Sequence, residues 1–312
     1  MGRVWIPVSA TAAFLVAAVL AVVGAGEQAG VLSDWQALAL GTVQGFTELL
    51  PISSSGHLIL VPWLGGWRYL ETHEAFNQTF DVALHLGTLV AVVGYFWRDA
   101  VRLLAAWLGS LSRRRVETPD ERVAWLVFVA TIPAALAGAF GEDAIAAHLG
   151  EPWQIAILLG VFAGVLWLAD RTPARRGPAD LGPGHALGLG VAQSLALMPG
   201  VSRSGITITF ARFLGLDRDA AARVSFLLLI PTVLGAVVWK GVKDVLLGDL
   251  PPGWEGPFVV GTIAAAGSGL VAIGALLGYV RRHDYSPFVV YRLVLALAIL
   301  LVIASGARGS TF

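Results

Sequence analysis

The sequence of 312 residues contains no cysteine. Disulfides and thiolate metal sites are therefore excluded, and the compartment cannot be inferred from redox chemistry. Charge is also scarce, because Asp, Glu, Lys and Arg make up 13% of the chain, whereas ordinary soluble domains carry about 25%. The 21 basic residues match the 21 acidic ones, so no surplus of cations is available to displace counterions from a polyanion. This balance excludes nucleic acid as the main partner.

Common catalytic and nucleotide-binding motifs are absent as well. The sequence has no GxSxG elbow, P-loop, HExxH helix or dinucleotide-binding fingerprint. What the sequence does contain is apolar: 56% of the residues are hydrophobic, with 37 Gly and 11 Trp. This composition also excludes disorder, which requires low hydrophobicity.

Several apolar runs approach the roughly 20 residues, with 17 as the lower end, that a helix needs to cross the hydrocarbon core. They lie at about 4–26, 80–97, 123–140, 153–169, 224–240, 257–280 and 288–306. The sequence therefore predicts an all-α polytopic membrane protein. Gly-x-x-x-Gly spacings such as Gly160 to Gly164 indicate, weakly, close packing between such helices.

Two further apolar stretches, 34–64 and 184–214, are broken in the middle. Pro, Gly and Ser gather at Pro51–Gly56 in the first stretch and at Pro199–Gly205 in the second. Irregular backbone at membrane depth has to be buried in protein or to line a water-filled cavity. We therefore interpret each stretch as a re-entrant helical hairpin that enters the membrane and returns to the same side.

The two hairpins resemble each other. Gln44 to Gly56 and Gln193 to Gly205 have the same spacing, with matching serines between them, and each hairpin is followed by three apolar runs. Three is an odd number, so a unit of one hairpin and three spans ends on the opposite side of the membrane, and its second copy is inverted. We expect an inverted-topology repeat, with repeat 1 over 34–170 and repeat 2 over 184–306.

The basic residues give this layout an orientation. Most of the 21 fall on one side of the predicted spans, in the loops after the second, fourth and sixth of them. An excess of Lys and Arg marks the cytoplasmic side. Hairpin 34–64 then enters from outside and hairpin 184–214 from the cytoplasm, so their tips meet near the midplane. Residues 1–33 form an additional N-terminal hydrophobic helix, with a cleaved signal peptide as the alternative.

The hairpin tips carry the candidate site. Insertion of a charged side chain at the bilayer centre costs roughly 2.5–3.5 kcal/mol. Because of this cost, charged residues such as Glu48 and Arg203 at the hairpin tips indicate a functional role. Hydroxyl residues cap helix N-termini, and such termini favour phosphate. Serine clusters often bond only to neighbouring backbone, however, and a lone histidine such as His57 or His85 is commonly a packing residue. The candidates are Gln44, Glu48, Ser53, Ser54, Ser55, His57, Ser202, Arg203, Ser204 and Thr207.

The motifs at these tips resemble those of a known family. Gln44-Gly-Phe-Thr-Glu48-Leu-Leu-Pro-Ile-Ser-Ser-Ser-Gly-His57 is similar to the first signature of the bacterial undecaprenyl-diphosphate phosphatases, also called the bacitracin resistance protein family. Pro199-Gly-Val-Ser-Arg-Ser-Gly205 is similar to the second. The resemblance runs from about residue 34 to about residue 305.

This resemblance implies hydrolysis of undecaprenyl diphosphate to undecaprenyl phosphate and inorganic phosphate. That reaction recycles the lipid carrier of peptidoglycan synthesis and gives bacitracin resistance, at the outer face of the bacterial cytoplasmic (inner) membrane. The expected partners are the polyprenyl diphosphate and membrane lipids. The formation of a homodimer is left undecided. By position in the motifs, the catalytic residues are Glu48, Ser54, His57 and Arg203, and the substrate-binding residues are Gln44, Ser53, Ser55, Ser202, Ser204 and Thr207.

The same resemblance implies a divalent cation, Mg²⁺ or Ca²⁺, near Glu48. Gln44 stands where many family members have Glu, so this position supplies one carboxylate instead of two. The nucleophile stays open: Ser54 activated by His57 with Glu48 behind it, a water activated by the same pair, or His57 itself. A secondary transporter or flippase of polyprenyl phosphate is the alternative function, since inverted repeats and broken helices are also transporter features.

Overall fold

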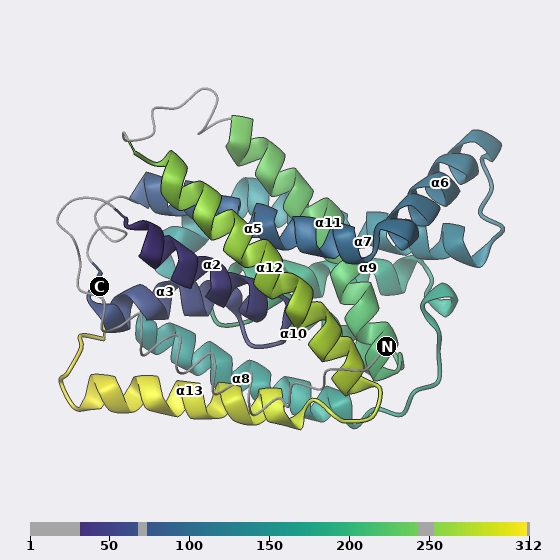
Figure 1. The fold of residues 1–312 in the computed structure, drawn as a ribbon. Helices are drawn as coiled ribbons and strands as arrows, with labels where there is room; N and C mark the ends of the chain where they lie inside the picture. Colours follow the sequence, from purple (N-terminus) through teal and green to yellow (C-terminus); the bar gives the residue numbers. More distant parts are fainter. Residues whose placement is uncertain (1–31, 68–73, 243–252, 311–312) are drawn as a thin grey trace, which may run out of the picture.

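A computed structural model of the chain describes residues 32–67, 74–242 and 253–310. Within these ranges every element is helical (Figure 1). The expected N-terminal helix at 1–33 lies outside the described residues except for its last two positions. In chain order the helices are α2 (Asp34–Leu49), α3 (Ser54–Gly65), α5 (Glu74–Tyr95), α6 (Trp97–Arg113), α7 (Pro119–His148), α8 (Pro152–Asp170), α9 (Pro183–Ser194), α10 (Arg203–Phe213), α11 (Arg218–Lys240), α12 (Glu255–Val280) and α13 (Ser286–Ala304), with 3-10 turns η1 (Pro178–Asp180) and η2 (Leu195–Leu197).

Six of the described helices are long and apolar enough to cross a membrane. They correspond to the six predicted apolar runs that fall within the described residues. The candidate spans are Phe76–Tyr95 in α5, Pro119–Gly141 in α7, and the whole of α8, α11, α12 and α13. The described part of the chain is therefore all-helical, with the spans of a multi-pass membrane protein, as the composition predicts.

Short polar signals fix where these helices begin. The Thr118 hydroxyl accepts a hydrogen bond from Glu121 N (3.2 Å), and Pro119 occupies the first position of α7. Asp217 likewise accepts from Ala220 N (2.7 Å) at the start of α11. These are the capping residues and the proline position that helix N-termini prefer.

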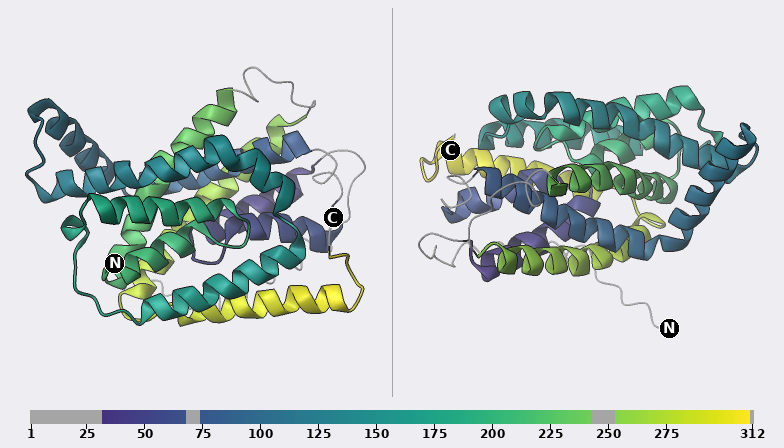
Figure 2. Two further views of the ribbon diagram at one scale, coloured as in Figure 1. Left: turned by 180° about the vertical axis from the view of Figure 1, so that it is seen from behind. Right: turned by 90° about the horizontal axis from the view of Figure 1, so that it is seen from above.

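Helix α6 was not predicted. It follows α5 directly and projects from the edge of the helical bundle, as Figure 1 and the second view in Figure 2 both show. Its apolar residues recur every three or four positions between arginines and are not contiguous, so a search for long apolar runs does not detect it. Helices α2, α3 and α10 lie among the spans in Figure 1.

Glycine allows α2 to lie directly against α12. A Cβ atom placed on Gly41 would come within 2.2 Å of Gly261 O, and one on Gly45 within 2.4 Å of Ala265 O. A side chain at either position would force the two backbones apart. Gly160 and Gly164 do not make a close helix–helix contact, because no described atom lies within 4 Å of a Cβ placed at either glycine. That prediction was wrong because spacing alone does not say which helix face meets a neighbour.

Candidate active site

The helices α3 and α10 begin in the same unusual way. Their cap residues, Ser53 and Ser202, have φ values of 78° and 77°, a region that non-glycine residues rarely adopt. The Ser53 hydroxyl accepts from Gly56 N (3.4 Å), and the Ser202 hydroxyl accepts from Gly205 N (3.0 Å). Backbone strain of this kind persists where the surroundings enforce it, and it clusters at functional sites. The two matched strained caps therefore indicate a functional site at these two turns.

The two turns are bonded to each other. Gly200 N donates to Ser53 Oγ (3.1 Å), and Ser204 Oγ donates to Leu50 O (2.8 Å). From α13, the fully buried Arg292 donates through Nη2 to the carbonyls of Gly200 and Val201, each at 3.0 Å. Residues about 150 positions apart are thus held as one unit.

Glu48 is the centre of the polar cluster that forms there. Its side chain is 4% exposed, and Oε1 accepts from Arg203 Nε at 3.0 Å. Its other oxygen, Oε2, accepts from the Ser54 hydroxyl and from Gln44 Nε2 (3.4 Å). Three other residues predicted from the two motifs, Gln44, Ser54 and Arg203, therefore meet at the Glu48 carboxylate.

Arg203 has hydrogen-bond donors that the contact with Glu48 does not use. Its Nη1 donates to Ser225 O (2.9 Å) on α11, but Nη2 is buried and has no hydrogen-bond partner among the described residues. A guanidinium offers five donors in a planar fork that matches phosphate oxygens. A buried donor without a partner is costly, and Nη2 is therefore a donor that an anionic ligand could satisfy.

His57 is engaged away from this cluster. Its Nδ1 lies 2.6 Å from Ser53 O, and its Nε2 lies 2.7 Å from the Tyr291 hydroxyl. The His57 and Tyr291 rings also stack, with centroids 5.7 Å apart. Both ring nitrogens are occupied, so the ring braces the first turn against α13, and Ser54 has Glu48 as its direct partner.

His85 is the contact that the sequence analysis missed. Its Nε2 lies 3.5 Å from Glu48 Oε2, and its Nδ1 lies 2.7 Å from Asp81 O on the preceding turn of α5. The sequence indicates a packing residue at this position, and the structure instead places the imidazole beside the Glu48 carboxylate. The pattern Asp81-Val-Ala-Leu-His85 in an apolar span was the available signal, because it places two polar side chains on one helix face.

The remaining predicted residues shape the second turn or line the cluster. Thr207 is fully buried, and its hydroxyl oxygen lies 2.7 Å from both Arg203 O and Ser225 Oγ. The hydroxyls of Ser202 and Ser204 lie 3.3 Å apart. Ser55 is half-buried, and its hydroxyl has no hydrogen-bond partner within the described part of the chain.

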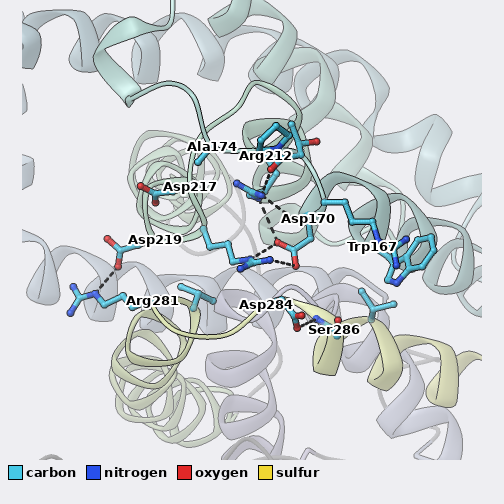
Figure 3. A pocket seen from close by; sticks show the side chains of 15 residues that line it. Trp167, Asp170, Ala174, Arg212, Asp217, Asp219, Arg281, Asp284 and Ser286 are labelled. Atoms are coloured by element: carbon cyan, nitrogen blue, oxygen red, sulfur yellow. Dashed lines mark hydrogen bonds and ion pairs between the residues drawn. The ribbon is translucent and has the colours of Figure 1, made fainter.

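A pocket of about 800 Å³ lies elsewhere, where α8 and α12 end and α11 and α13 begin (Figure 3). Two of its four carboxylates form ion pairs, Asp170 with Arg218 (2.7 Å) and Asp219 with Arg281 (2.9 Å), and the other two, Asp217 and Asp284, accept from the backbone N–H groups of Ala220 and Ser286. Figure 3 shows this network as a set of mutual contacts. Because its charges neutralise one another, we assign the pocket a structural role and place the candidate site at Glu48.

The residues around Glu48 supply only part of the ligand set that a divalent cation needs. No cluster of three or more His, Asp and Glu side chains that could hold a metal occurs in the described ranges. Glu48 supplies one carboxylate, and Gln44 Oε1 is a buried oxygen without a hydrogen-bond partner among the described residues. Hard cations take six or more oxygen ligands. The pair therefore fits a cation that draws its other ligands from a phosphate substrate and water.

A family model described as "Bacitracin resistance protein BacA" matches residues 37–298, a range that contains both turns of the candidate site. The chain belongs to this family. It is 48% identical to a protein named undecaprenyl-diphosphatase from Thermomicrobium roseum, over 88% of this chain and 99% of the relative. Relatives of the same name from Desulforudis audaxviator and Pelotomaculum thermopropionicum are 45% and 42% identical over 87% and 89% of this chain, and over 98% and 100% of their own. The BacA match confirms the family that the two motifs indicated.

Proposed function

We propose that this protein is an integral membrane phosphatase that hydrolyses undecaprenyl diphosphate to undecaprenyl phosphate and inorganic phosphate. The observation that carries the proposal is the buried cluster of Glu48, Arg203 and Ser54 between two capped helix starts. The names of the three relatives described above supply the substrate. In this proposal the reaction recycles the lipid carrier for peptidoglycan synthesis and confers bacitracin resistance.

Arg203 and the helix starts bind the diphosphate in this scheme. The free Nη2 of Arg203 and the positive ends of α3 and α10 favour negative charge where the two turns meet. Phosphoryl transfer is catalysed mainly by positioning and by neutralising the charge of the transferred group. Ser53, Ser55, Ser202, Ser204 and Thr207 either supply hydroxyls or fix the turns that do.

Glu48 is the proton acceptor that the geometry favours. Its carboxylate accepts directly from the Ser54 hydroxyl, whereas both nitrogens of His57 are engaged elsewhere. A diphosphate that binds Arg203 competes for the guanidinium that Glu48 now holds, which frees the carboxylate. Glu48 then takes a proton from Ser54 or from a water, the oxygen attacks phosphorus, and the P–O bond to undecaprenyl phosphate breaks. If Ser54 attacks, water hydrolyses the resulting phosphoserine.

Phosphate release in detergent tests this proposal. We expect Arg203→Lys, Glu48→Gln and Ser54→Ala to lower kcat by roughly 100-fold or more, the usual loss of a preorganised charge or donor. Thr42→Ala on α2 is the matched control, since its hydroxyl bonds only within its own helix. A phosphoenzyme trapped in the wild type and absent from Ser54→Ala supports covalent catalysis. Full activity in Arg203→Lys, or counterflow of labelled lipid without phosphate release, contradicts the proposal, and the latter favours the transporter alternative.

We further propose that Glu48 and Gln44 hold the divalent cation. Such an ion supplies charge neutralisation at the phosphate oxygens. We expect a chelator to lower activity and added Mg²⁺ or Ca²⁺ to restore it. Gln44→Glu adds a second carboxylate, so the cation concentration for half-maximal activity should fall. Activity that survives exhaustive chelation contradicts a cation at this position.

The repeat architecture belongs to the same proposal. We propose that the α2–α3 and α9–α10 hairpins are re-entrant and that repeats 34–170 and 184–306 are inverted copies, preceded by a hydrophobic segment at 1–33. The equal φ values and identical caps at Ser53 and Ser202 support it. The site then opens to the outer face of the bacterial inner membrane.

A further inference from the structure

The hydrogen bonding of His85 fixes which of its ring nitrogens carries a proton. Its Nδ1 lies 2.7 Å from Asp81 O, a carbonyl oxygen that can only accept, so Nδ1 is the N–H donor. In a neutral imidazole the other nitrogen, Nε2, is then an acceptor. A metal-binding histidine almost always donates its second ring N–H to a carboxylate, a backbone carbonyl or water, which fixes the tautomer and orients the ring. His85 has this arrangement, with Nε2 left as the ligand atom.

The Nε2 atom of His85 faces a carboxylate oxygen at a separation that suits two ligands of one ion. It lies 3.5 Å from Glu48 Oε2. A hydrogen bond between an imidazolium and a carboxylate is about 2.7–2.9 Å long, so this separation is too long for one. Two ligand atoms that each lie roughly 2.1 Å from a cation are about 3.0–3.4 Å apart in octahedral or tetrahedral geometry. The observed separation is closer to the second case than to the first.

Gln44 supplies a third candidate ligand atom beside the same carboxylate. Its side chain is fully buried, its Nε2 lies 3.4 Å from Glu48 Oε2, and its Oε1 has no hydrogen-bond partner among the described residues. A buried oxygen without a partner is costly, and a cation beside Glu48 would satisfy it. Arg203 binds the other carboxylate oxygen of Glu48, Oε1. The guanidinium and the candidate ligands therefore use different oxygens of Glu48.

We propose that His85 is a ligand of the cation at Glu48 and Gln44, and that its nitrogen makes this site prefer a transition-metal dication to Mg²⁺ or Ca²⁺. The inference rests on the proposed function, which places a cation at Glu48. Imidazole nitrogen suits transition metals, whereas Mg²⁺ and Ca²⁺ take oxygen ligands. The side chain of His85 is 29% exposed and that of Glu48 is 4% exposed, so the ion reaches the carboxylate from the His85 side.

Mn²⁺ added to the detergent-solubilised protein, without substrate and without a polyhistidine tag, tests the ligand directly. Pulsed electron paramagnetic resonance detects a nitrogen nucleus when imidazole coordinates Mn²⁺. We expect this nitrogen signal in the wild type and its loss in His85→Gln. His148→Gln is the matched control, because His148 makes the same Nδ1 contact with a backbone carbonyl (Ala144 O, 2.8 Å) but its side chain is exposed. A wild type without the nitrogen signal, or a signal that persists in His85→Gln, overturns the proposal.

The affinities for two ions test the preference. Mn²⁺ is the weakest binder among the first-row transition metals, which makes it a stringent probe. We expect wild type to bind Mn²⁺ more tightly than Mg²⁺, and His85→Gln, which replaces the nitrogen by an amide, to lose roughly 10–100-fold in Mn²⁺ affinity, as for a damaged ligand shell, with little change for Mg²⁺. Equal losses for the two ions contradict the preference.

These measurements need no substrate, so the two proposals fail separately. A nitrogen signal in a protein that releases no phosphate from undecaprenyl diphosphate supports the metal ligand and removes the hydrolase. Phosphate release by a wild type that shows no nitrogen signal leaves the hydrolase in place and overturns the role of His85.

Discussion

Glu48 and Arg203 form a buried ion pair, and its contribution to the free energy of unfolding depends on the presence of both partners. The Glu48 carboxylate and the Arg203 guanidinium lie 3.0 Å apart in surroundings that exclude most water. Removal of one partner leaves the other charge buried without compensation, which typically costs 3–5 kcal/mol, whereas replacement of both by apolar groups is often nearly neutral. The pair therefore contributes little net stability compared with apolar groups in its place.

This reasoning predicts a non-additive pair of variants. Glu48→Ala alone and Arg203→Met alone should each be destabilised by about 3 kcal/mol or more. The double variant Glu48→Ala/Arg203→Met should be more stable than either single one, although it stays inactive. Unfolding midpoints in detergent, together with phosphate release, measure the two effects separately. Additive losses of stability in the double variant contradict this account of the pair.

Ser53 combines backbone strain with two hydrogen bonds at its hydroxyl. Its φ of 78° suits glycine, whereas its Oγ accepts from Gly56 N and from Gly200 N. Ser53→Ala loses both bonds and keeps the strained backbone, and Ser53→Gly loses the bonds but relieves the strain.

We therefore expect Ser53→Ala to be the less stable variant, by about 1 kcal/mol relative to Ser53→Gly. Thermal midpoints of the two proteins in the same detergent measure the difference. Ser305→Gly, at an exposed serine beyond the end of α13, controls for a glycine introduced elsewhere. Equal midpoints for the two Ser53 variants imply that the positive φ at this position carries no strain.

At the scale of elements, α6 presents an apolar face that no described helix covers. Trp97, Val101, Leu104, Leu108 and Leu111 are between 43% and 60% exposed and follow one another at helical spacing. Arginines occupy other faces of the same helix. A helix with these properties lies in the plane of the membrane surface, with its apolar face in the acyl boundary.

The absence of cysteine from the chain makes this simple to test. A fluorophore on Leu104→Cys or Leu108→Cys should be quenched by brominated lipid and shielded from aqueous iodide. The same fluorophore on Arg102→Cys, whose native side chain is 58% exposed, should show the reverse. Strong iodide quenching at Leu104 contradicts a membrane-surface position for α6.

The side chains that line the pocket in Figure 3 connect the ends of several helices. Asp170, at the end of α8, accepts from Arg218 Nε (2.7 Å) and from Tyr285 N (2.9 Å), and it lies 3.5 Å from Arg212 Nε. The Tyr285 hydroxyl donates to Arg218 O (3.0 Å), and burial raises the pKa of Tyr285. One carboxylate therefore joins the ends of four helices.

We expect Asp170→Asn to cost about 3–5 kcal/mol, because the buried Arg212 loses its carboxylate partner. Asp120→Asn removes an exposed pair with Arg102, and such pairs contribute about 0–1 kcal/mol. Unfolding midpoints of the two variants give the comparison. Similar small losses in both proteins contradict a supporting role for the Asp170 network.

At the scale of the whole molecule, the proposed orientation has a direct consequence for accessibility. Ser112, near the end of α6, belongs to the arginine-rich side, and Ser305 follows α13 on the opposite side; both are exposed. We expect a membrane-impermeant maleimide to label Ser305→Cys on intact cells, and Ser112→Cys only after permeabilisation. The opposite result places the site on the cytoplasmic face and contradicts the proposed location.

The sequence by itself predicted the helical class, the six described spans and the residues of the two turns. These follow from local properties: the length of an apolar run, a capping serine, and the cost of a charge such as Glu48 in an apolar stretch. The sequence did not predict α6, because its apolar residues are periodic instead of contiguous. Nor did it identify Gly41 and Gly45 as the close contact between helices.

Only the tertiary structure decided which side chains complete the cluster. The distances from His85 to Glu48, from Gly200 to Ser53 and from Arg292 to the second turn join residues that are 37 to about 150 positions apart. Such contacts depend on how closely helices approach, as where α2 meets α12, and on which face each helix turns inward. Periodicity along a chain fixes a helix face but not its neighbour, so these partners follow from packing alone.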